Sequence, residues 1–284
     1  MEPKALYTVR RGLATLGPAL VALKAALDQR FAAWADEVGA VSMLYPTLMP
    51  VAELEPLDYF RNFPHLAVAA SGVRAERLEA GFGRDEIDAM EAIPGADLAD
   101  ARYVLPSAAC YNVYVHLKDE VLEGPLYITT VATCYRNETH YDELQRLWSF
   151  TMREVVCLGS AEEVQEHLRA FKARILAFAG RLGLGLTVAA ATDPFYQPGS
   201  PVAVMQKLFP QKEELQYRGE LAIASVNFHR NFFGERCRIR NPAGEPVFTG
   251  CAAFGIERWL HALLDRFEGD ADAALAAVER DPEA

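Results

Sequence analysis

Arginine, glutamate and phenylalanine recur at alternate positions in two neighbouring segments, TCYRNE at 133–138 and LWSFTMRE at 147–154. A guanidinium holds a phosphate through two parallel hydrogen bonds, and a phenyl ring gives a nucleobase a flat apolar platform. Because alternate residues of a strand share a face, Arg136 and Phe150 predict a nucleotide cradle. A salt-bridged sheet edge above a core phenylalanine is the alternative interpretation. The residues expected to share this face are Cys134, Arg136, Glu138, Trp148, Phe150, Met152 and Glu154.

A glycine-containing helix start supplies a second basic group. The segment 249–259, TGCAAFGIERW, changes from a strand-like pattern to a helix, and Arg258 lies in the first turns of that helix. The N-terminus of a helix attracts anions, and an arginine there adds to the attraction. Arg258 is therefore a candidate for a second phosphate contact, with a surface arginine beside Glu257 as the alternative.

Five cysteines stand at positions 110, 134, 157, 237 and 251, without a CxxC pair. An odd number at these spacings does not indicate a disulfide framework. Thiolates are good ligands for zinc, but a buried cysteine is also a small apolar core residue, and spacing alone leaves both roles open.

The candidate arginines, glutamates and cysteines must be positioned by helices and strands, and the sequence shows patterns of both kinds. Apolar residues over 13–38 follow a 3.6-residue period, and a short strand-like run then ends at Pro46. SAEE at 160–163 has the sequence of a capping box, and the helix that it opens is expected to end near Gly183. The expected strands are 102–106, 126–138, 147–158, 184–192, 220–228, 236–241 and 246–251, and further helices are expected at 85–93 and 254–267.

The order of these elements indicates the fold class. Strand pairs are interrupted by helices without regular βαβ alternation, and no internal repeat or low-complexity linker divides the chain. We therefore predict a single α+β domain over 1–284, with a mainly antiparallel sheet flanked by helices.

Composition and charge exclude several classes of protein. With 51% hydrophobic residues and a mean hydropathy of 0.00, the chain can bury a full core. It has no run of about 18 apolar residues and no secretory signal near Met1, so we expect no membrane segment and a cytoplasmic location. The formal net charge of −11 opposes binding to nucleic acid. Residues 200–240 nevertheless hold seven Lys or Arg against four Glu, which fits either a local anionic partner or chance clustering on a solvated face.

Taken together and in this order, the segments resemble the catalytic core of the class II aminoacyl-tRNA synthetases. Residues 12–46 match motif 1, a helix and strand that end at a proline, and 135–150 match the Arg-x-Glu hairpin of motif 2. The sequence Gly-Ile-Glu-Arg at 255–258 matches motif 3, Gly-x-Glu-Arg. The three motifs cover most of the chain, and the resemblance implies a homodimer formed through motif 1.

Four longer segments narrow the resemblance: LPSAACYNVY, SFTMREVVCLG, ELAIASVNFHRNFFG and TGCAAFGIERW. They are similar to the atypical, zinc-containing seryl-tRNA synthetases of methanogens and to their truncated relatives, the amino acid:[carrier protein] ligases. A core that starts close to Met1, a net charge of −11 and a short Ala-rich acidic tail after Glu268 all favour the truncated branch. We expect neither a tRNA-binding domain nor an anticodon module.

The resemblance implies a zinc site at Cys110, Glu154 and Cys251. In that family three protein ligands hold the ion and leave the fourth position for the amino group of the substrate. Cys134 is the main rival, because it is expected to share the strand face of Arg136, whereas the other cysteines match no ligand position.

The resemblance also implies how ATP is bound in the presence of Mg²⁺. Arg136 would bind the α-phosphate, Phe150 would stack under adenine and Arg258 would hold the γ-phosphate end. Glu220 would coordinate Mg²⁺ with Asn227 close by, although the spacing between these two differs slightly from that of ordinary seryl enzymes. The remaining candidates are Glu138 at the adenine or ribose, and Arg146 and His140 in the motif 2 loop, where an exposed loop histidine is the alternative.

The implied reaction is ATP-dependent activation of a small amino acid, glycine before alanine, as an aminoacyl-adenylate. The amino acid then passes to the phosphopantetheine thiol of a carrier protein. Segment 193–215 lies where the ligases carry a docking helix, and it offers Lys207, Leu208 and Lys212 to an acidic carrier, with a core-facing connecting helix as the alternative. A tRNA-aminoacylating enzyme and a non-catalytic synthetase paralogue are the competing hypotheses, and retention of the motif arginines disfavours the paralogue.

Overall fold

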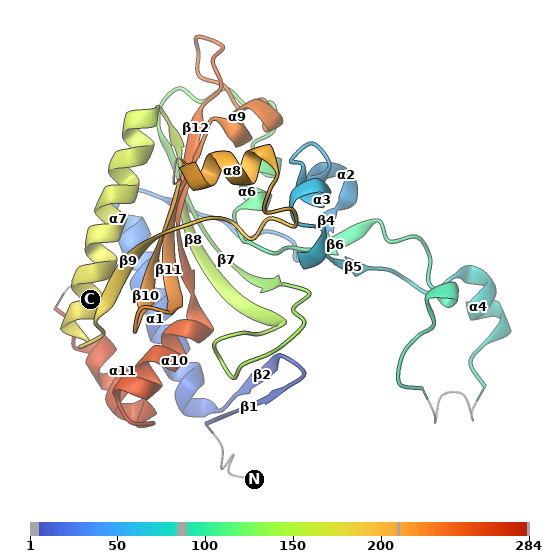
Figure 1. Ribbon diagram of the computed structural model, residues 1–284, viewed down its shortest axis with the longest axis horizontal. Helices are drawn as coiled ribbons and strands as arrows, with labels where there is room; N and C mark the ends of the chain where they lie inside the picture. The colour runs from blue at the N-terminus through green and yellow to red at the C-terminus, as the bar shows by residue number, and fades with distance from the viewer. Residues whose placement is uncertain (1–5, 84–89, 209–210, 283–284) are drawn as a thin grey trace.

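The computed structural model describes residues 6–83, 90–208 and 211–282 (Figure 1). Within these ranges no helix is both long enough and apolar enough to cross a bilayer. The helix expected at 85–93 lies mostly outside the described residues, and its last four residues, 90–93, are not helical.

A seven-stranded sheet forms the centre of the molecule (Figure 1). Its strand order is β3-β7-β8-β12-β11-β10-β9, and every neighbouring pair is antiparallel except β3 with β7. The predicted α+β class with a mainly antiparallel sheet is therefore confirmed. The strands are β3 Val41–Ser42, β7 Leu126–Tyr135, β8 Ser149–Gly159, β9 Leu186–Ala191, β10 Lys212–Tyr217, β11 Leu221–Arg230 and β12 Phe248–Gly255.

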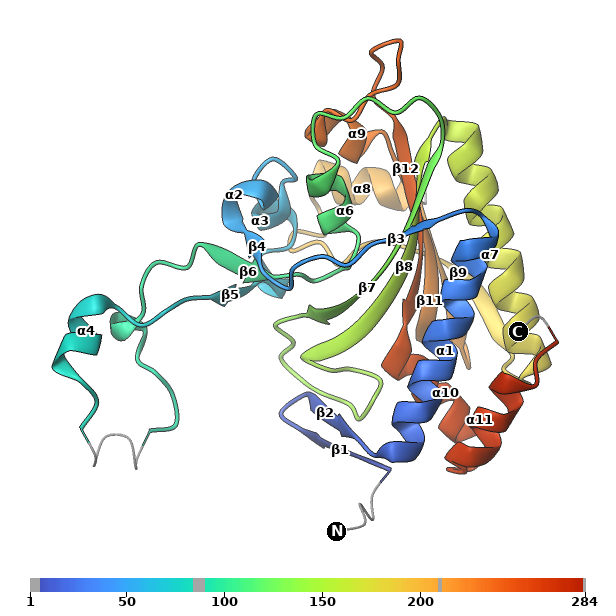
Figure 2. The same cartoon turned by 180° about the vertical axis from the view of Figure 1, so that it is seen from behind.

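Helices cover one face of this sheet, the face seen in Figure 2. Helices α1, α7 and α10 pack on the strands, and α11 packs on α1 and α10. The apolar sides of these helices pack against the sheet residues that point toward them and form one core. In this core the rings of Phe31 and Phe254 are stacked with their centroids 4.1 Å apart. Burial of each large apolar side chain contributes about 1.5–3 kcal/mol to the free energy that holds this helical layer on the sheet. The helices are α1 Pro18–Glu37, α7 Ala161–Arg181, α10 Ile256–Arg266 and α11 Ala271–Glu279.

Helix α1 starts later than its apolar period predicts. Pro18 occupies the first turn, where its fixed φ suits a helix and its missing N–H is not needed. Residues Leu13–Leu16 instead form strand β2, which pairs with β1, Tyr7–Arg10, in a hairpin. Gly12 has a φ of +74° in the turn, and its carbonyl oxygen accepts from the Trp148 N–H at 2.9 Å. The hairpin therefore supports the loop of motif 2.

The β7–β8 hairpin and the start of α7 agree with the prediction. Cys134 pairs with Phe150 across the hairpin, so the two predicted strands lie antiparallel. The Ser160 side chain accepts from the Glu163 backbone N–H, and the Glu163 carboxylate accepts from the Ser160 N–H, which is the predicted capping box.

Side chains of β8 alternate between the two faces of the sheet. Arg153 points to the helical layer, where its guanidinium makes a two-point ion pair with Asp28 of α1. Glu154 points to the opposite face. Its register partner in β12 is Ala253, and Cys251, two residues earlier, lies on the same face. The antiparallel register thus brings Glu154 and Cys251 together from distant parts of the chain.

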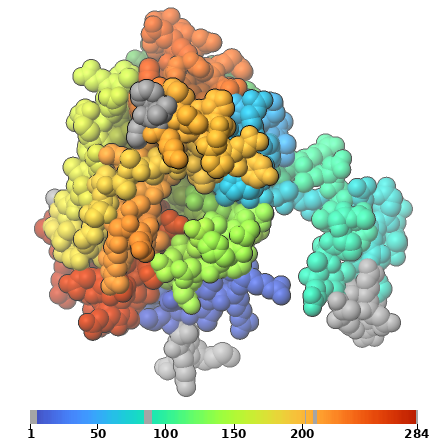
Figure 3. Space-filling view, viewed as in Figure 1, coloured from blue at the N-terminus to red at the C-terminus, as the bar shows by residue number. Residues whose placement is uncertain are grey.

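Shorter elements lie on this opposite face of the sheet. A three-stranded sheet, ordered β4-β6-β5, lies next to α2 and α3, and α9 packs against β11, β12 and α6 (Figure 1). Helix α4, Ala75–Ala80, belongs to an arm between β5 and β6 that stands away from the rest of the molecule (Figure 3). The other elements are β4 Met49–Pro50, β5 Val68–Ala70, β6 Tyr103–Leu105, α2 Val51–Leu54, α3 Tyr59–Asn62, η1 Pro64–Leu66, η2 Gly95–Asp97, α6 Tyr111–His116, α8 Pro201–Leu208 and α9 Phe232–Cys237.

One predicted strand, 236–241, is wrong. Cys237 and Ile239 alternate with arginines as in a half-buried strand, but Cys237 ends helix α9. Arg238 then has a φ of +55°, which an extended strand does not adopt. The side chains of Cys237 and Ile239 are both buried in the same core cluster. Cys237 reaches it from the end of α9, and Ile239 reaches it after the chain bends at Arg238.

Candidate active site

Two adjoining cavities lie on the face of the sheet opposite α1. The larger has a volume of about 260 Å³ and contains Glu154, and the smaller has a volume of about 100 Å³ and contains Arg258. The residues that line both cavities are Arg136, Met152, Lys212, Ser225 and Ala253. Because these side chains form a common wall, a ligand in one cavity lies next to a ligand in the other.

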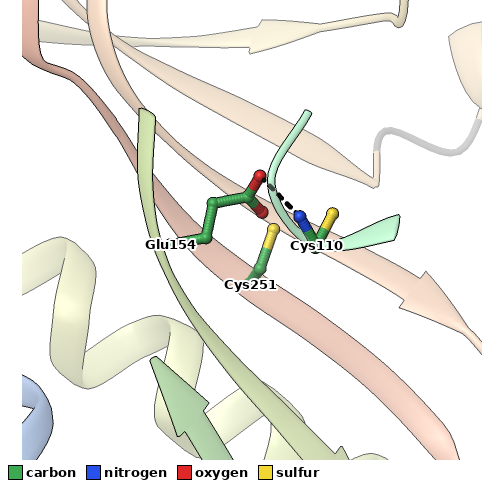
Figure 4. Close-up of side chains that lie close together, drawn as sticks. All are labelled: Cys110, Glu154 and Cys251. Carbon is green, nitrogen blue, oxygen red and sulfur yellow. Dashed lines mark hydrogen bonds between the residues drawn. The ribbon is translucent and has the colours of Figure 1, made fainter. Parts of the chain in front are cut away.

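Cys110, Glu154 and Cys251 meet in the larger cavity (Figure 4). Their ligand atoms lie within 4.8 Å of one another, and all three residues are buried. Cys110 directly precedes α6, whereas the other two come from neighbouring strands. Over the described ranges, no other set of three His, Cys, Asp or Glu side chains has this geometry. The structure therefore brings the three predicted zinc ligands together.

The chemistry of these donors fits Zn²⁺. Two sulfurs and one carboxylate oxygen make a three-ligand set that leaves a fourth position for substrate, as in catalytic zinc sites. The backbone N–H groups of Ala109 and Cys110 donate to Oε1 of Glu154 at 2.8 and 3.1 Å, which orients the carboxylate. The hydrogen bond with Cys251, together with burial and the nearby Glu154, raises the pKa of the Cys110 thiol well above its ordinary value. A bound cation would offset the negative charge that opposes ionisation here.

Cys134 does not join this group, although it lies on the same face of the sheet as Phe150. Its thiol is buried, its Sγ lies 4.0 Å from the carbonyl oxygen of Ala132, and it lines neither cavity. Burial strongly raises its pKa. Cys157 and Cys237 lie in two separate core clusters. Among the five cysteines, only Cys110 and Cys251, the two predicted zinc ligands, line the cavity that contains Glu154.

The aromatic and basic residues of motif 2 lie around the smaller cavity. The guanidinium carbon of Arg136 lies 5.0 Å from the centre of the Phe150 ring, so the charge rests on the predicted adenine platform. Arg146 forms an ion pair with Glu138, with 2.9 Å between Nη1 and Oε2. All four line the cavity, whereas His140 is exposed and lines neither one.

Arg258 is fixed at the other side of this cavity. Its Nε donates to the carbonyl oxygen of Gln145 at 2.8 Å, and its Nη1 donates to that of Ala222 at 2.9 Å. Burial and the nearby Arg136 and Arg146 lower the pKa of Arg258 to about 10, which leaves it protonated at neutral pH. Three guanidinium groups thus line one small cavity and can donate hydrogen bonds to an anionic ligand there, although Glu138, Glu214 and Glu257 line it as well.

The two residues predicted beside Mg²⁺ are not brought together. Glu220 is exposed in the turn between β10 and β11, and it lines neither cavity. Asn227 lies in the larger cavity, where its Nδ2 donates to Cys251 Sγ at 3.4 Å and to Ser225 Oγ at 3.1 Å. Asn227 therefore lies beside the predicted zinc ligands.

Glu214 is a cavity residue that the sequence prediction missed. It lies on β10 opposite Ser225 of β11, lines the smaller cavity, and has its Oε1 3.3 Å from Lys212 Nζ. The alternating run KEELQY was available as a strand signal, but it overlaps the segment that was assigned to carrier docking. His229, two residues beyond Asn227, was missed as well, and it lines the larger cavity, where burial lowers its pKa to about 4.

Only part of the segment 193–215, predicted to dock the carrier, is helical in the structure. Helix α8 contains Lys207, which is exposed, and Leu208, whose side chain lies outside the described part. Lys212 instead begins β10, lines both cavities and has its Nζ 3.4 Å from Oδ1 of Asp193. Residues 212–215 are therefore part of a strand of the main sheet rather than of a helix, and Lys212 faces the cavities.

The start of this segment lines the larger cavity. The Asp193 N–H donates to Oε1 of Gln206 at 2.7 Å, and Nε2 of Gln206 donates to Oδ2 of Asp193 at 3.0 Å. Phe195 stacks on Phe63 with 5.2 Å between ring centroids. Gln206 of α8 also lines the larger cavity, so α8 lies beside it.

Comparison with known proteins gives the family of the chain. Residues 96–267 match the tRNA synthetase class II core domain (G, H, P, S and T). The chain is 35% identical over 254 residues to amino acid–[acyl-carrier-protein] ligase 1 of Bradyrhizobium diazoefficiens, covering 85% of this chain and 76% of that protein. Ligase 2 of the same organism is 36% identical over 234 residues, with 78% and 68% covered.

Seryl-tRNA synthetases are more distant relatives. The type-2 serine–tRNA ligase of Methanothermobacter thermautotrophicus is 26% identical over 274 residues, which cover 89% of this chain and 53% of that protein. The crystal structure of M. kandleri SerRS in complex with A. aeolicus tRNASec superposes with a TM-score of 0.77 at 21% identity, covering 96% of this chain and 57% of that one. The chain thus spans little more than half the length of these seryl enzymes. From the class II core and the identity to both Bradyrhizobium ligases, we conclude that the chain belongs to the amino acid:[carrier protein] ligases, an enzyme family built on the class II synthetase fold.

Proposed function

We propose that this protein activates a small amino acid with ATP and transfers it to the phosphopantetheine thiol of a carrier protein. The common wall of the two cavities carries the proposal, because Arg136 lines both the cavity of the two cysteines and that of Arg258. An amino acid held at the thiols would present its carboxylate to a nucleotide held by the arginines. The names of the two Bradyrhizobium relatives, amino acid–[acyl-carrier-protein] ligases, support the carrier protein as the acceptor.

The amino acid end of the site uses the three predicted metal ligands. Cys110, Glu154 and Cys251 would hold Zn²⁺, which when bound supplies a Lewis-acid position for the α-amino group. Met152 and Phe233 line the same cavity. The preference for glycine first and alanine second rests on the resemblance to the ligase family.

In the activation step the protein contributes position and charge rather than a nucleophile. A carboxylate oxygen of the amino acid forms a bond to the α-phosphorus of ATP, and the bond from that phosphorus to pyrophosphate breaks. Arg136 would donate to the α-phosphate oxygens as charge develops there, and Arg258 would bind the departing phosphates. Phe150 would support the adenine once Arg136 has turned from its ring to the phosphate.

In the transfer step the carrier thiol attacks the carbonyl carbon of the adenylate. A sulfur–carbon bond forms, the thiol proton passes to water, and the carbon–oxygen bond to AMP breaks. The products are AMP and an aminoacyl thioester on the carrier.

Amino acid-dependent exchange of labelled pyrophosphate into ATP tests the activation step. We expect exchange with glycine above all other standard amino acids, followed by alanine. Exchange that is greatest with a larger amino acid such as serine would contradict the proposed specificity.

We propose that Glu214, rather than Glu220, assists in binding Mg²⁺·ATP, because Glu214 lines the arginine cavity and Glu220 is exposed outside it. Glu214→Gln is expected to reduce pyrophosphate exchange roughly 10²-fold and to raise the Mg²⁺ concentration needed for half-maximal rate. Glu220→Gln is the matched control, and its exchange rate is expected to stay unchanged. A reduced exchange rate in Glu220→Gln with an unchanged rate in Glu214→Gln would instead assign Mg²⁺·ATP binding to Glu220.

We propose that α8 docks the carrier through Lys207 and the apolar side chains exposed next to it, Val204 and Met205. Carrier proteins are typically acidic, so Lys207→Glu is expected to slow thioester transfer about 3- to 10-fold without changing pyrophosphate exchange. Arg169→Glu makes the same charge change on α7, on the other side of the sheet, and is expected to leave both rates unaltered. Equal transfer rates in the two variants would place docking elsewhere.

We also propose a homodimer formed through motif 1. The edge strand β3 and the loop after it expose Val41 and Leu44, the latter by 84%. Pairing of a second copy along this edge would cover them. A monomeric mass by sedimentation at micromolar concentration would contradict this assembly.

A further inference from the structure

His229 lies in the larger cavity beside Cys251, and neither chemical step described above uses it. Its Nδ1 lies 3.2 Å from the hydroxyl of Tyr114 and 3.3 Å from Oγ1 of Thr249. Its Nε2 lies 3.9 Å from Sγ of Cys251. One ring nitrogen therefore faces two buried hydroxyl groups, and the other faces one of the predicted zinc ligands.

Either ring nitrogen of a neutral imidazole can carry the proton, and the tautomer that fits the role proposed below has it on Nε2. Burial raises the pKa of Tyr114 well above its ordinary value, so this phenol keeps its proton. In this tautomer Nδ1 is unprotonated and accepts a hydrogen bond from the phenol. The proton of the neutral ring then lies on Nε2, the nitrogen that faces Cys251.

Aromatic packing fixes this arrangement. The ring of Tyr114 stacks on Phe233 with 3.8 Å between centroids and an interplanar angle of 10°. Phe233 meets the ring of His229 edge-on at 5.1 Å. Since Tyr114 comes from α6 and Phe233 from α9, two helices together set the direction of the imidazole on β11.

The two thiols of the site have unequal surroundings. Cys251 Sγ accepts from Nδ2 of Asn227 at 3.4 Å and lies 3.9 Å from Nε2 of His229. In the described part of the chain, no hydrogen bond from an N–H to the sulfur of Cys110 is found. Asn227 and His229 thus surround Cys251 but not Cys110, and neither residue has a substrate-binding role in the proposed reaction.

We propose that His229, oriented by Tyr114, is a positioning residue of the zinc site that donates its Nε2–H to the Cys251 thiolate. The inference rests on the zinc ligation proposed above. An N–H donor withdraws electron density from a metal-bound thiolate and holds it in one direction, which makes the metal a stronger acid for a substrate amine. His229 does not belong to the group whose ligand atoms lie within 4.8 Å of one another, which separates this role from that of a fourth ligand.

The test uses the whole 284-residue protein, loaded with Co²⁺ for spectroscopy and titrated with Zn²⁺ against a chromophoric chelator. His229→Phe is expected to weaken Zn²⁺ binding about 10- to 100-fold and to move the thiolate-to-cobalt charge-transfer band to lower energy. Tyr114→Phe removes one hydroxyl and keeps the ring, so both changes are expected in smaller measure. His229→Gln retains an N–H donor and is expected to recover part of the affinity.

Tyr103→Phe is the matched control, because this tyrosine of β6 is 47% exposed and lines neither cavity. Wild-type values of band energy and Zn²⁺ affinity in both His229→Phe and Tyr114→Phe would overturn the inference while leaving amino acid activation in place. A change of coordination number in His229→Phe would make His229 a ligand instead. An unmodified protein that binds neither metal would overturn the zinc ligation and this inference together.

Discussion

Replacing Arg136 by alanine is expected to reduce amino acid-dependent pyrophosphate exchange by roughly 10³-fold. Arg136 lines both cavities, so its guanidinium is placed where the carboxylate of the amino acid would meet the α-phosphate. Charge on the phosphate oxygens increases in the transition state, and loss of the donor leaves that charge without a partner. The measurement is the initial rate of exchange at saturating ATP and glycine.

The size of this effect has an internal control. Arg169 on α7 pairs with Glu166 at the surface, and Arg169→Ala removes the same group without touching either cavity. Its exchange rate is expected to stay within twofold of the unmodified protein. Arg136→Lys keeps the positive charge but loses the two parallel hydrogen bonds that a guanidinium can donate, so an intermediate exchange rate is expected. An Arg136→Ala variant as active as Arg169→Ala would remove Arg136 from the mechanism.

Replacing either Cys110 or Cys251 by alanine is expected to abolish zinc binding. Both sulfurs lie within 4.8 Å of each other and of the Glu154 carboxylate, and two ligands are too few for a tightly held ion. Purified protein should contain about one Zn²⁺ per chain, and either variant should contain less than a tenth of that amount. The measurement is elemental analysis after dialysis, with circular dichroism to confirm that the variants are folded.

Two other buried cysteines control for the loss of a thiol. Cys157 lies in the helical core and Cys237 at the end of α9, and neither lines the larger cavity. Cys157→Ala and Cys237→Ala are expected to keep their zinc. Full zinc content in both Cys110→Ala and Cys251→Ala would reject the ligand assignment.

Local patterns made part of the fold predictable. The capping box at Ser160 and the antiparallel β7–β8 hairpin depend on residues close together in the chain, and both are present in the structure. The start of α1 was misplaced because an apolar 3.6-residue period continues through Leu13–Leu16, which pair with a preceding strand instead. Strand β10 was missed because its charged residues, Lys212 and Glu214 among them, lie on a face that is lined by cavities rather than by the core.

The site itself depends on contacts that spacing does not encode. Nothing in the separation of five cysteines selects Cys110 and Cys251; the resemblance to a known family supplied that choice. The structural reason is the register of β8 with β12, which places Cys251 on the face of Glu154. His229 shows the same limit, since its partners come from α6 and β12, far away in the sequence.

The most direct test of the proposed function follows the amino acid to its acceptor. Holo carrier protein and total tRNA are incubated in parallel with the enzyme, ATP and labelled glycine, and each acceptor is analysed for covalently bound label and intact mass. We expect one glycyl group on the carrier, released by hydroxylamine as a thioester is and absent when the carrier lacks phosphopantetheine, with no label on tRNA. Label on tRNA with none on the carrier would contradict the proposed function and make the protein a tRNA-aminoacylating enzyme; label on neither, without pyrophosphate exchange, would favour a non-catalytic paralogue.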